Sequence, residues 1–339
     1  MTMPNHYTIY GGALSYFTRK LEAACLFYGL EFEMCNKNQS DPAIIEARSG
    51  THQVPVLQTP ENWMIGDTTP IMHMLDGRYP KRQMYPAGPE AVLVQIVEEY
   101  FDEWVARTMV HYRWHYPESA EFASKIMADG NPAIAERMLS WGPRACRATG
   151  TDSDVQRKAA EAEYLRILEA AEKQLGETRY LMGERPTAVD CIVLGGLRAH
   201  TYMDPVPKRV TANYPRVVSY SEGGLDQWDG SGGLPAFPET TAFGEFVLGE
   251  MVDTYQPYVL ANGAAQKAGA KAFHADIYGE EVSYLSRPYP ETSRGMIIDN
   301  IRCLLDQQAQ SEVNVWLESK GLRAFSWTLD FRPEVAPQL

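Results

Sequence analysis

The 339-residue sequence has no uncharged apolar run approaching 18 residues, so it offers no candidate for a membrane-spanning helix. It also lacks an excess of positive charge, because 44 acidic residues against 31 lysines and arginines give a formal net charge of −13. That balance argues against nucleic acid and anionic membrane surfaces as partners. The first ten residues contain no basic segment followed by an apolar one, and we therefore expect a cytoplasmic protein.

Cysteine is scarce, and its spacing contains no C-x-x-C pair. An odd number of scattered cysteines is typical of reduced thiols rather than of a disulfide framework or a zinc site. Histidine gives no metal-ligand spacing either, because His111 and His115 are four residues apart without an evident third ligand. We expect no bound metal. The five cysteines are Cys25, Cys35, Cys146, Cys191 and Cys303.

What the sequence does contain is ordinary globular composition, with 45% hydrophobic and 22% charged residues. The length suggests two domains, or one domain with large additions. Short β-type runs alternate with helical spacing over the first 83 residues, which predicts a compact α/β module. Its expected elements, in chain order, are a strand at 7–10, a helix at 15–29, a strand at 30–34, a helix at 42–48, strands at 54–57 and 62–65, and a helix at 68–79.

The module is organised around the predicted strand 54–57 and the residues that follow it. Pro55 has no N–H, so the strand should lie at a sheet edge or the Val54–Pro55 bond should be cis, turning the Val54 backbone groups outward. Asp67 and Thr68 precede an apolar run, and a helix that begins there would offer N–H and hydroxyl groups to a carboxylate. These two pieces can hold a small peptide, although an edge strand and a capped helix would give the same pattern.

A proline-rich linker at 80–89 precedes sequence of helical character. Apolar residues keep helical spacing over 92–116 and 154–175. Thr187 and Asp190 fit a capping box that opens a further helix, whose Gly195 and Gly196 predict tight packing. Beyond about residue 223 a long segment carries an apolar stripe that needs cover from its own domain or from a partner.

Taken together, these residues resemble the glutathione S-transferase family. The likeness covers residues 5–80 well and 90–220 loosely, and it implies a thioredoxin-like α/β domain at 1–83 and an all-helical domain at 90–339. Typical members lack the C-terminal extension that starts near 223. The motifs that carry the resemblance are Val54-Pro55-Val56-Leu57, Asp67-Thr68 and Pro186-Thr187-Ala188-Val189-Asp190.

The resemblance implies a glutathione site. The N–H and C=O of Val54, next to Pro55, would pair with the cysteinyl backbone of glutathione. Thr68 would bind the γ-glutamyl carboxylate and Asp67 the γ-glutamyl ammonium. Gln53 stands where members often carry a polar or basic side chain near the glycyl carboxylate.

The catalytic group must stabilise the glutathione thiolate, because the thiolate is the nucleophile. Ser15 matches the serine-type arrangement of the family, in which a serine opens the first helix. Tyr10 and Tyr16 remain alternatives, and Tyr16 replaces a proline found in many members. No cysteine occupies the position, which disfavours thiol–disulfide exchange.

Three functions stay open: a transferase that attacks a small hydrophobic electrophile, a glutathione-dependent lyase, isomerase or dehalogenase, and a non-catalytic binding or assembly protein. The family resemblance implies a homodimer, and we expect the extension to thicken the helical domain and to cover the second-substrate pocket. That pocket would lie along the helix at 92–116, where packing alone could also explain its aromatic and basic residues Trp104, Arg107, Tyr112, Arg113 and Trp114.

Overall fold

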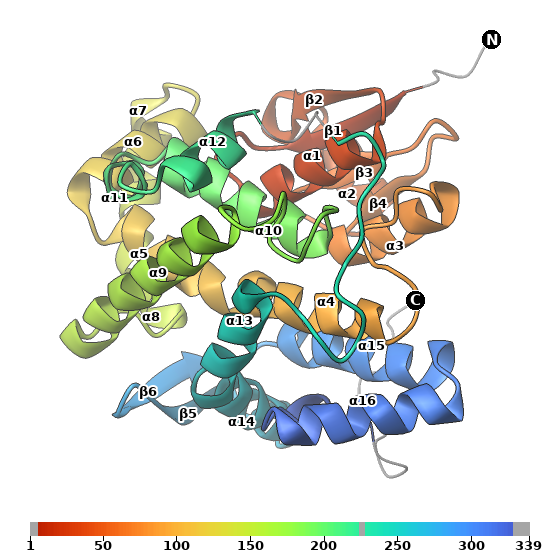
Figure 1. Ribbon diagram of the computed structural model, residues 1–339. Helices are drawn as coiled ribbons and strands as arrows, with labels where there is room; N and C mark the ends of the chain where they lie inside the picture. The colour runs from red at the N-terminus through yellow and green to blue at the C-terminus, as the bar shows by residue number, and fades with distance from the viewer. Residues whose placement is uncertain (1–5, 224–227, 328–339) are drawn as a thin grey trace.

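The computed structural model describes residues 6–223 and 228–327. An N-terminal domain with a small mixed sheet is followed by a helical domain, as the sequence predicted (Figure 1). The C-terminal third lies along one side of α4 (Pro89–Glu99), and α10 (Ala188–Gly196) packs on that helix as well. None of the helices within the described ranges is long and apolar enough to cross a membrane.

The N-terminal domain has the β-α-β-α-β-β-α order that the sequence predicted. Its four strands lie in the order β2-β1-β3-β4; β1 pairs with β2 in parallel and with β3 antiparallel, and β3 pairs antiparallel with β4. The elements are β1 (Tyr7–Gly11), α1 (Tyr16–Tyr28), β2 (Phe32–Asn36), a 3-10 turn (Lys37–Gln39), α2 (Pro42–Ser49), β3 (Val56–Gln58), β4 (Met64–Gly66) and α3 (Thr68–Arg78).

Pro55 does not lie within a strand, because β3 begins one residue after it, at Val56. The Val54–Pro55 peptide bond is cis, which was one of the two alternatives for this position. The other alternative, an edge strand, is wrong, since β3 has β1 on one side and β4 on the other. A proline that precedes the strand removes no ladder hydrogen bond from the interior of the sheet.

The helical domain begins with one continuous helical path from α4 through a π-helical segment, η2 (Tyr100–Val105), into α5 (Ala106–Trp114). The sequence predicted a single helix at 92–116 without the π-helical turn. The remaining elements of this domain are α6 (Pro117–Met127), α7 (Pro132–Leu139), α8 (Gly142–Ala148), α9 (Asp154–Gln174), α10, η3 (Leu197–Tyr202), α11 (Pro205–Thr211) and α12 (Pro215–Gly223).

The two domains meet where α1 packs closely on α10. A Cβ atom on Gly195 would lie 2.3 Å from the backbone nitrogen of Lys20, and one on Gly196 would lie 2.1 Å from the ring of Tyr16. Only glycine allows so close an approach of two helices, which confirms the tight packing predicted for this pair. The contact fixes the N-terminal domain against the helical domain.

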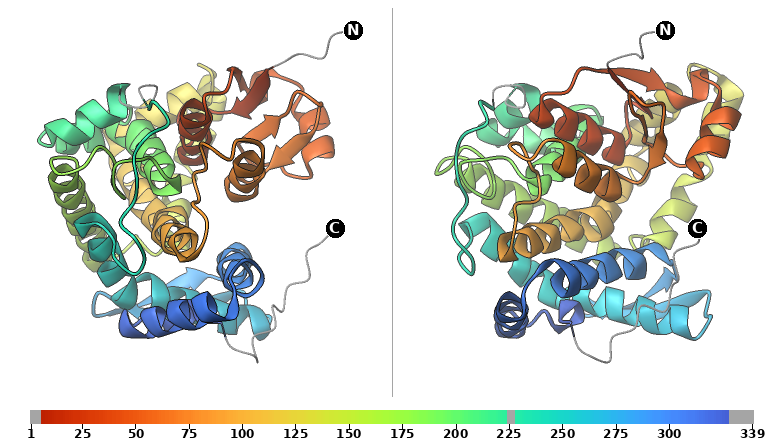
Figure 2. Two further views of the ribbon diagram at one scale, coloured as in Figure 1. Left: turned by 45° about the vertical axis from the view of Figure 1, so that its right-hand side comes forward. Right: turned by 90° about the vertical axis from the view of Figure 1, so that its right-hand side faces the viewer.

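The extension contains helices and one β-hairpin, and the sequence analysis did not anticipate the hairpin. Its apolar stripe is mainly buried: Phe243, Val247 and Met251 are fully enclosed, and α13 packs against α9 and α4. The chain therefore covers the stripe itself. Figure 2 shows the extension, coloured teal to blue, along one side of the molecule. The elements are α13 (Ala242–Asp253), α14 (Tyr255–Lys267), β5 (Ala272–Ile277), β6 (Glu280–Leu285), α15 (Tyr289–Leu304), α16 (Gln307–Ser319) and a 3-10 turn (Arg323–Phe325).

Candidate functional site

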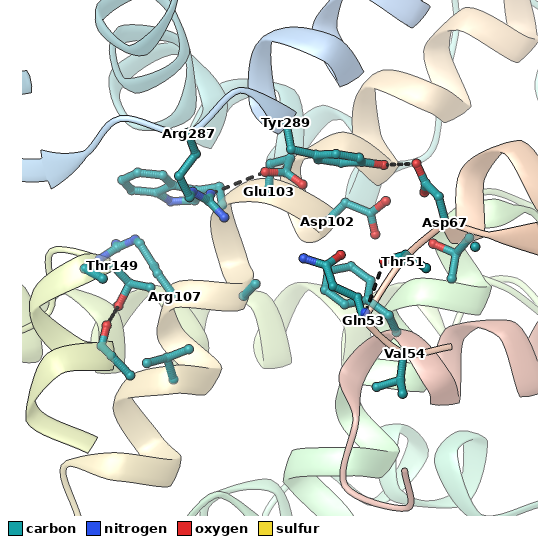
Figure 3. Close-up of a pocket in the computed structure, with 18 of the residues that line it drawn as sticks. Thr51, Gln53, Val54, Asp67, Asp102, Glu103, Arg107, Thr149, Arg287 and Tyr289 are labelled. Atoms are coloured by element: carbon teal, nitrogen blue, oxygen red, sulfur yellow. Dashed lines mark hydrogen bonds and ion pairs between the residues drawn. The ribbon is translucent and has the colours of Figure 1, made fainter. Parts of the chain in front are cut away.

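A cavity of about 670 Å³ lies where the N-terminal domain, the helical domain and the extension meet. Its wall includes all five residues that the resemblance assigned to glutathione binding, namely Gln53, Val54, Pro55, Asp67 and Thr68. The sequence separates these residues into two groups, which the turn after α2 and the β3–β4 hairpin bring together. Figure 3 shows Gln53, Val54 and Asp67 at the same end of the cavity.

Asp67 forms the N-cap of α3 in a tight turn after β4. Its φ of 70° lies in the left-handed region, which aspartate tolerates better than most side chains. The Oδ1 atom accepts a hydrogen bond from the Thr69 N–H at 3.3 Å. Thr68 is the first residue of the helix, and the first N–H groups of a helix have no partner within it. The arrangement can therefore receive an anionic group at Thr68.

The second carboxylate oxygen of Asp67 already has a partner from the extension. The Tyr289 hydroxyl donates a hydrogen bond to Asp67 Oδ2 at 2.6 Å, and both residues line the cavity (Figure 3). This bond joins the first residue of α15 to the N-terminal domain. The extension thus reaches the part of the site that the resemblance assigned to the γ-glutamyl end of glutathione.

Ser15 lies at the N-terminus of α1, but it does not line the cavity as the other five candidates do. Its Oγ accepts a hydrogen bond from the Thr18 N–H at 3.2 Å, so it caps the helix. Phe17, two residues further on, does line the cavity. The cap uses Oγ only as an acceptor, and the hydroxyl can still donate to a ligand that extends toward α1.

The two tyrosine alternatives to Ser15 are engaged in other contacts. The Tyr16 hydroxyl donates to the backbone oxygen of Phe101 at 3.3 Å within the domain interface, and burial raises its pKa well above the ordinary value. Tyr10 donates to Gln58 Oε1 at 2.9 Å, and burial raises its pKa too. Neither residue lines the cavity.

Of the five residues proposed for a second substrate, the cavity wall contains Trp104 and Arg107. The other three pack away from it. Arg113 pairs with Asp204 at 2.9 Å, Tyr112 is buried against Tyr164, and the Trp114 side chain lies against Gly142.

The sequence analysis missed two groups of wall residues. The first is Asp102 and Glu103, adjacent acids in the π-helical segment, and the only available signal was their position inside an apolar helix. The second comes from the extension, where no local pattern marked it. Its members are Tyr258, Tyr284, Arg287 and Tyr289. The extension therefore forms part of the wall, in keeping with the prediction that it covers the pocket.

Asp102 belongs to a buried charge network between the two domains. The Lys20 ammonium, which is fully buried, lies 2.6 Å from Asp102 Oδ2 and 2.5 Å from Glu98 Oε1. Burial raises the pKa of the Asp102 carboxyl to about 8, although Lys20 opposes the rise. The two carboxylates outweigh the effect of burial on Lys20 and raise its pKa. The lysine therefore stays charged at neutral pH, whereas burial favours the neutral form of the Asp102 carboxyl.

Two family models match separate parts of the chain: one described as the glutathione S-transferase N-terminal domain, over residues 9–83, and one described as the C-terminal domain, over residues 136–223. A search of the curated proteins found no match. Within the described residues, no group of three or more histidine, cysteine, aspartate or glutamate side chains could hold a metal ion.

Similar solved structures include a glutathione S-transferase from Rhodospirillum rubrum F11, with 20% identity, a TM-score of 0.43, and coverage of 63% of this chain and 86% of that one. Another, from Methylobacterium radiotolerans in complex with glutathione sulfonate, has 17% identity, a TM-score of 0.42 and coverage of 66% and 92%. A third, from Methylobacillus flagellatus KT with glutathione bound, has 15% identity, a TM-score of 0.41 and coverage of 63% and 92%.

Proposed function

Since the chain belongs to the glutathione S-transferase family, we propose that it binds glutathione and activates the thiol for attack on a small electrophile. One observation carries this proposal: the five residues assigned to glutathione line a single cavity that also has room for a second substrate. At about 670 Å³ the cavity lies within the usual size range of small-molecule sites.

In the proposed complex, the backbone groups of Val54 pair with the cysteinyl backbone of glutathione. The γ-glutamyl carboxylate accepts hydrogen bonds from the Thr68 N–H and hydroxyl, where the α3 dipole favours negative charge. The γ-glutamyl ammonium pairs with Asp67. Gln53 is close to the glycyl carboxylate. The Tyr289 hydroxyl, which now donates to Asp67, either shares that carboxylate with the ammonium or yields it.

Calorimetry tests the binding proposal directly. We expect wild-type protein to bind glutathione, and Asp67→Asn to weaken the affinity at least tenfold, because a charge-assisted hydrogen bond contributes about 1.5–3 kcal/mol. Asp41→Asn is the matched control, since Asp41 is an exposed N-cap on α2 outside the cavity. Folded wild-type protein that gives no heat with millimolar glutathione would contradict the proposal.

The Ser15 hydroxyl activates the thiol by donating a hydrogen bond to the thiolate, which lowers a thiol pKa that is normally about 8.5. We expect Ser15→Ala to keep glutathione binding while the pKa of the bound thiol, followed by thiolate absorbance, rises by about 1–2 units. Ser15→Thr keeps both the hydroxyl and the cap, and serves as the control. An unchanged thiolate titration in Ser15→Ala would remove Ser15 from the mechanism.

The reaction outcome could also be lysis, isomerisation or dehalogenation, each of which begins with the same thiolate. A non-catalytic relative would bind glutathione without lowering the pKa of its thiol. The homodimer stays a prediction that follows from the family resemblance, and the cytoplasmic location stays a prediction made from the N-terminal sequence and the scattered cysteines.

A further inference from the structure

The end of the cavity away from Asp67 is rich in hydrogen-bond donors. Arg107 of α5 and Tyr284 of β6 both line it, and Arg287 of the extension lies nearby. Figure 3 shows Arg107 and Thr149 together on one side, with Val54 and Asp67 on the other. The two ends of the cavity therefore differ in chemistry, since the Asp67 end also contains the Asp102 carboxylate.

Arg107 is a buried cation with unused donors. Only 4% of the residue is exposed, and its guanidinium stacks on the Trp104 ring at 4.1 Å. Its Nη2 donates to Glu163 Oε2 at 3.2 Å. Its Nε and Nη1 have no hydrogen-bond partner among the described residues. Unpaired N–H groups at so buried a position are unusual, and a bound water, ion or ligand group would satisfy them.

Glu163 cannot supply that partner, because both of its oxygens are already used. Oε1 accepts hydrogen bonds from Tyr100 at 3.0 Å, Trp104 at 2.7 Å and Tyr278 at 2.9 Å. Oε2 accepts one from Thr108 at 2.8 Å in addition to that from Arg107. A local rearrangement around Glu163 would therefore not satisfy the remaining Arg107 donors.

Tyr284 adds a third unused donor to the same wall. The residue is 2% exposed, and its hydroxyl has no partner among the described residues. Burial raises its pKa, and the charge of Arg107 opposes that rise, as expected for neighbouring groups. Its ring is held against Gly150, where an added Cβ would approach to 2.3 Å. The hydroxyl is thus a fixed, neutral donor at neutral pH.

We propose that Arg107 and Tyr284 bind a carboxylate of the second substrate, so that this substrate is an anionic rather than a purely hydrophobic electrophile. The inference rests on the proposed function, because that function supplies the reaction between glutathione and this substrate. A carboxylate accepts hydrogen bonds from a guanidinium and a hydroxyl at once, and the buried setting strengthens both.

Arg287 gives this end of the cavity a second positive charge. Its Nη2 lies 3.4 Å from Glu103 Oε2 and 3.1 Å from the Tyr258 hydroxyl. Burial raises the pKa of Glu103 to about 7, so near neutral pH this acid offsets the arginine only in part. An incoming anion is therefore attracted by Arg287 as well as by Arg107.

Benzoate and benzamide are suitable probes, because they share size and shape but differ in charge. On wild-type protein we expect calorimetry to show benzoate binding at least tenfold more tightly than benzamide. Tyr284→Phe and Arg107→Lys should each remove most of that preference, and the lysine keeps a positive charge beside Glu163. Tyr112→Phe removes the same atom from a buried tyrosine outside the cavity, and the preference should survive it.

Equal binding of the two probes, or a benzoate preference that persists in both cavity variants, would overturn the inference. Repeating the titration with saturating glutathione distinguishes the proposed carboxylate site from the glutathione site. Benzoate that competes with glutathione would occupy the position of the glycyl carboxylate, and this result would also overturn the inference. Protein that binds benzoate as expected but not glutathione would contradict the proposed function alone.

Turnover gives a second readout with 4-(chloromethyl)benzoate and its amide. In both, the glutathione thiolate forms a C–S bond at the benzylic carbon as the C–Cl bond breaks and chloride leaves. We expect the carboxylate to have at least tenfold higher kcat/KM, with most of the difference in KM, and Tyr284→Phe to remove it. The same kcat/KM for both compounds would count against the inference.

Discussion

Replacing Lys20 with methionine should lower the free energy of unfolding by about 3–5 kcal/mol, the usual effect of removing one partner from a buried ion pair. The Lys20 side chain has no exposed surface and contacts Glu98 and Asp102 at 2.5 and 2.6 Å. Methionine matches its length but leaves the two buried acids Glu98 and Asp102 together without a cation. Lys20 lies on α1, and the two acids lie on α4 and η2. The substitution should therefore weaken the interface between the two domains. Chemical denaturation measures the change.

The pH dependence of this loss provides an internal check. The folded pKa of Asp102 is raised to about 8 from an unfolded value near 3.9, so its contribution to stability is full below about pH 4 and is lost as pH rises through 8. The decrease in the free energy of unfolding caused by Lys20→Met should therefore be smaller at pH 6 than at pH 8.5.

Two further variants serve as controls. Combining Lys20→Met with Asp102→Asn should recover part of the lost stability, and Lys125→Met, at an exposed position, should change the free energy of unfolding by less than about 0.5 kcal/mol. A defect equal to that of Lys125→Met would contradict the network.

Asp190→Ala should destabilise the protein by about 3–5 kcal/mol, more than the 0.5–2 kcal/mol typical of a helix cap. The capping box predicted from the sequence is present, since Asp190 Oδ2 accepts from the Thr187 N–H at 2.8 Å. Its Oδ1 also accepts from the Leu181 N–H at 2.9 Å and the Tyr220 hydroxyl at 2.6 Å. Alanine would leave these buried donors unpaired, each at about 1–3 kcal/mol.

Asp41→Ala is the matched control for Asp190→Ala. Asp41 caps α2 with one hydrogen bond, to the Ile44 N–H at 3.2 Å, and it is exposed. Asp41→Ala should lower the free energy of unfolding by about 0.5–2 kcal/mol, the range for an isolated cap. Denaturation midpoints that shift equally in the two variants would show that the additional Asp190 bonds contribute nothing.

The features predicted correctly from the sequence are those that nearby residues determine. The α/β order of the first domain follows from alternating apolar runs punctuated by glycine and proline, and Asp190 is three residues from the helix start it caps. The adjacent residues Gly195 and Gly196 likewise predicted a close helix contact from the local sequence alone. The placement of Val54 and Asp67 in one cavity followed from the family resemblance, which supplied the long-range pairing that local patterns lack.

The missed features depend on contacts between distant segments. Tyr284 and Arg287 lie in the cavity wall because the β5–β6 hairpin and the segment after it pack back toward α5, and no local spacing encodes that return. Buried and exposed residues alternate along both hairpin strands, but such short alternation identifies a hairpin only when the partner strand is known. The buried charge of Lys20 was equally hidden, since a lysine on an amphipathic helix is usually exposed.

The Tyr289–Asp67 hydrogen bond, which joins residues 222 positions apart, also constrains when the site can form during synthesis. Domains generally fold from the N-terminus as the chain emerges, at about 5–20 residues per second. The thioredoxin-like domain is therefore complete roughly 10–45 s before α15 leaves the ribosome. During that interval the Asp67 end of the cavity lacks its last wall, because Tyr289, which donates the hydrogen bond to Asp67, has not yet been synthesised.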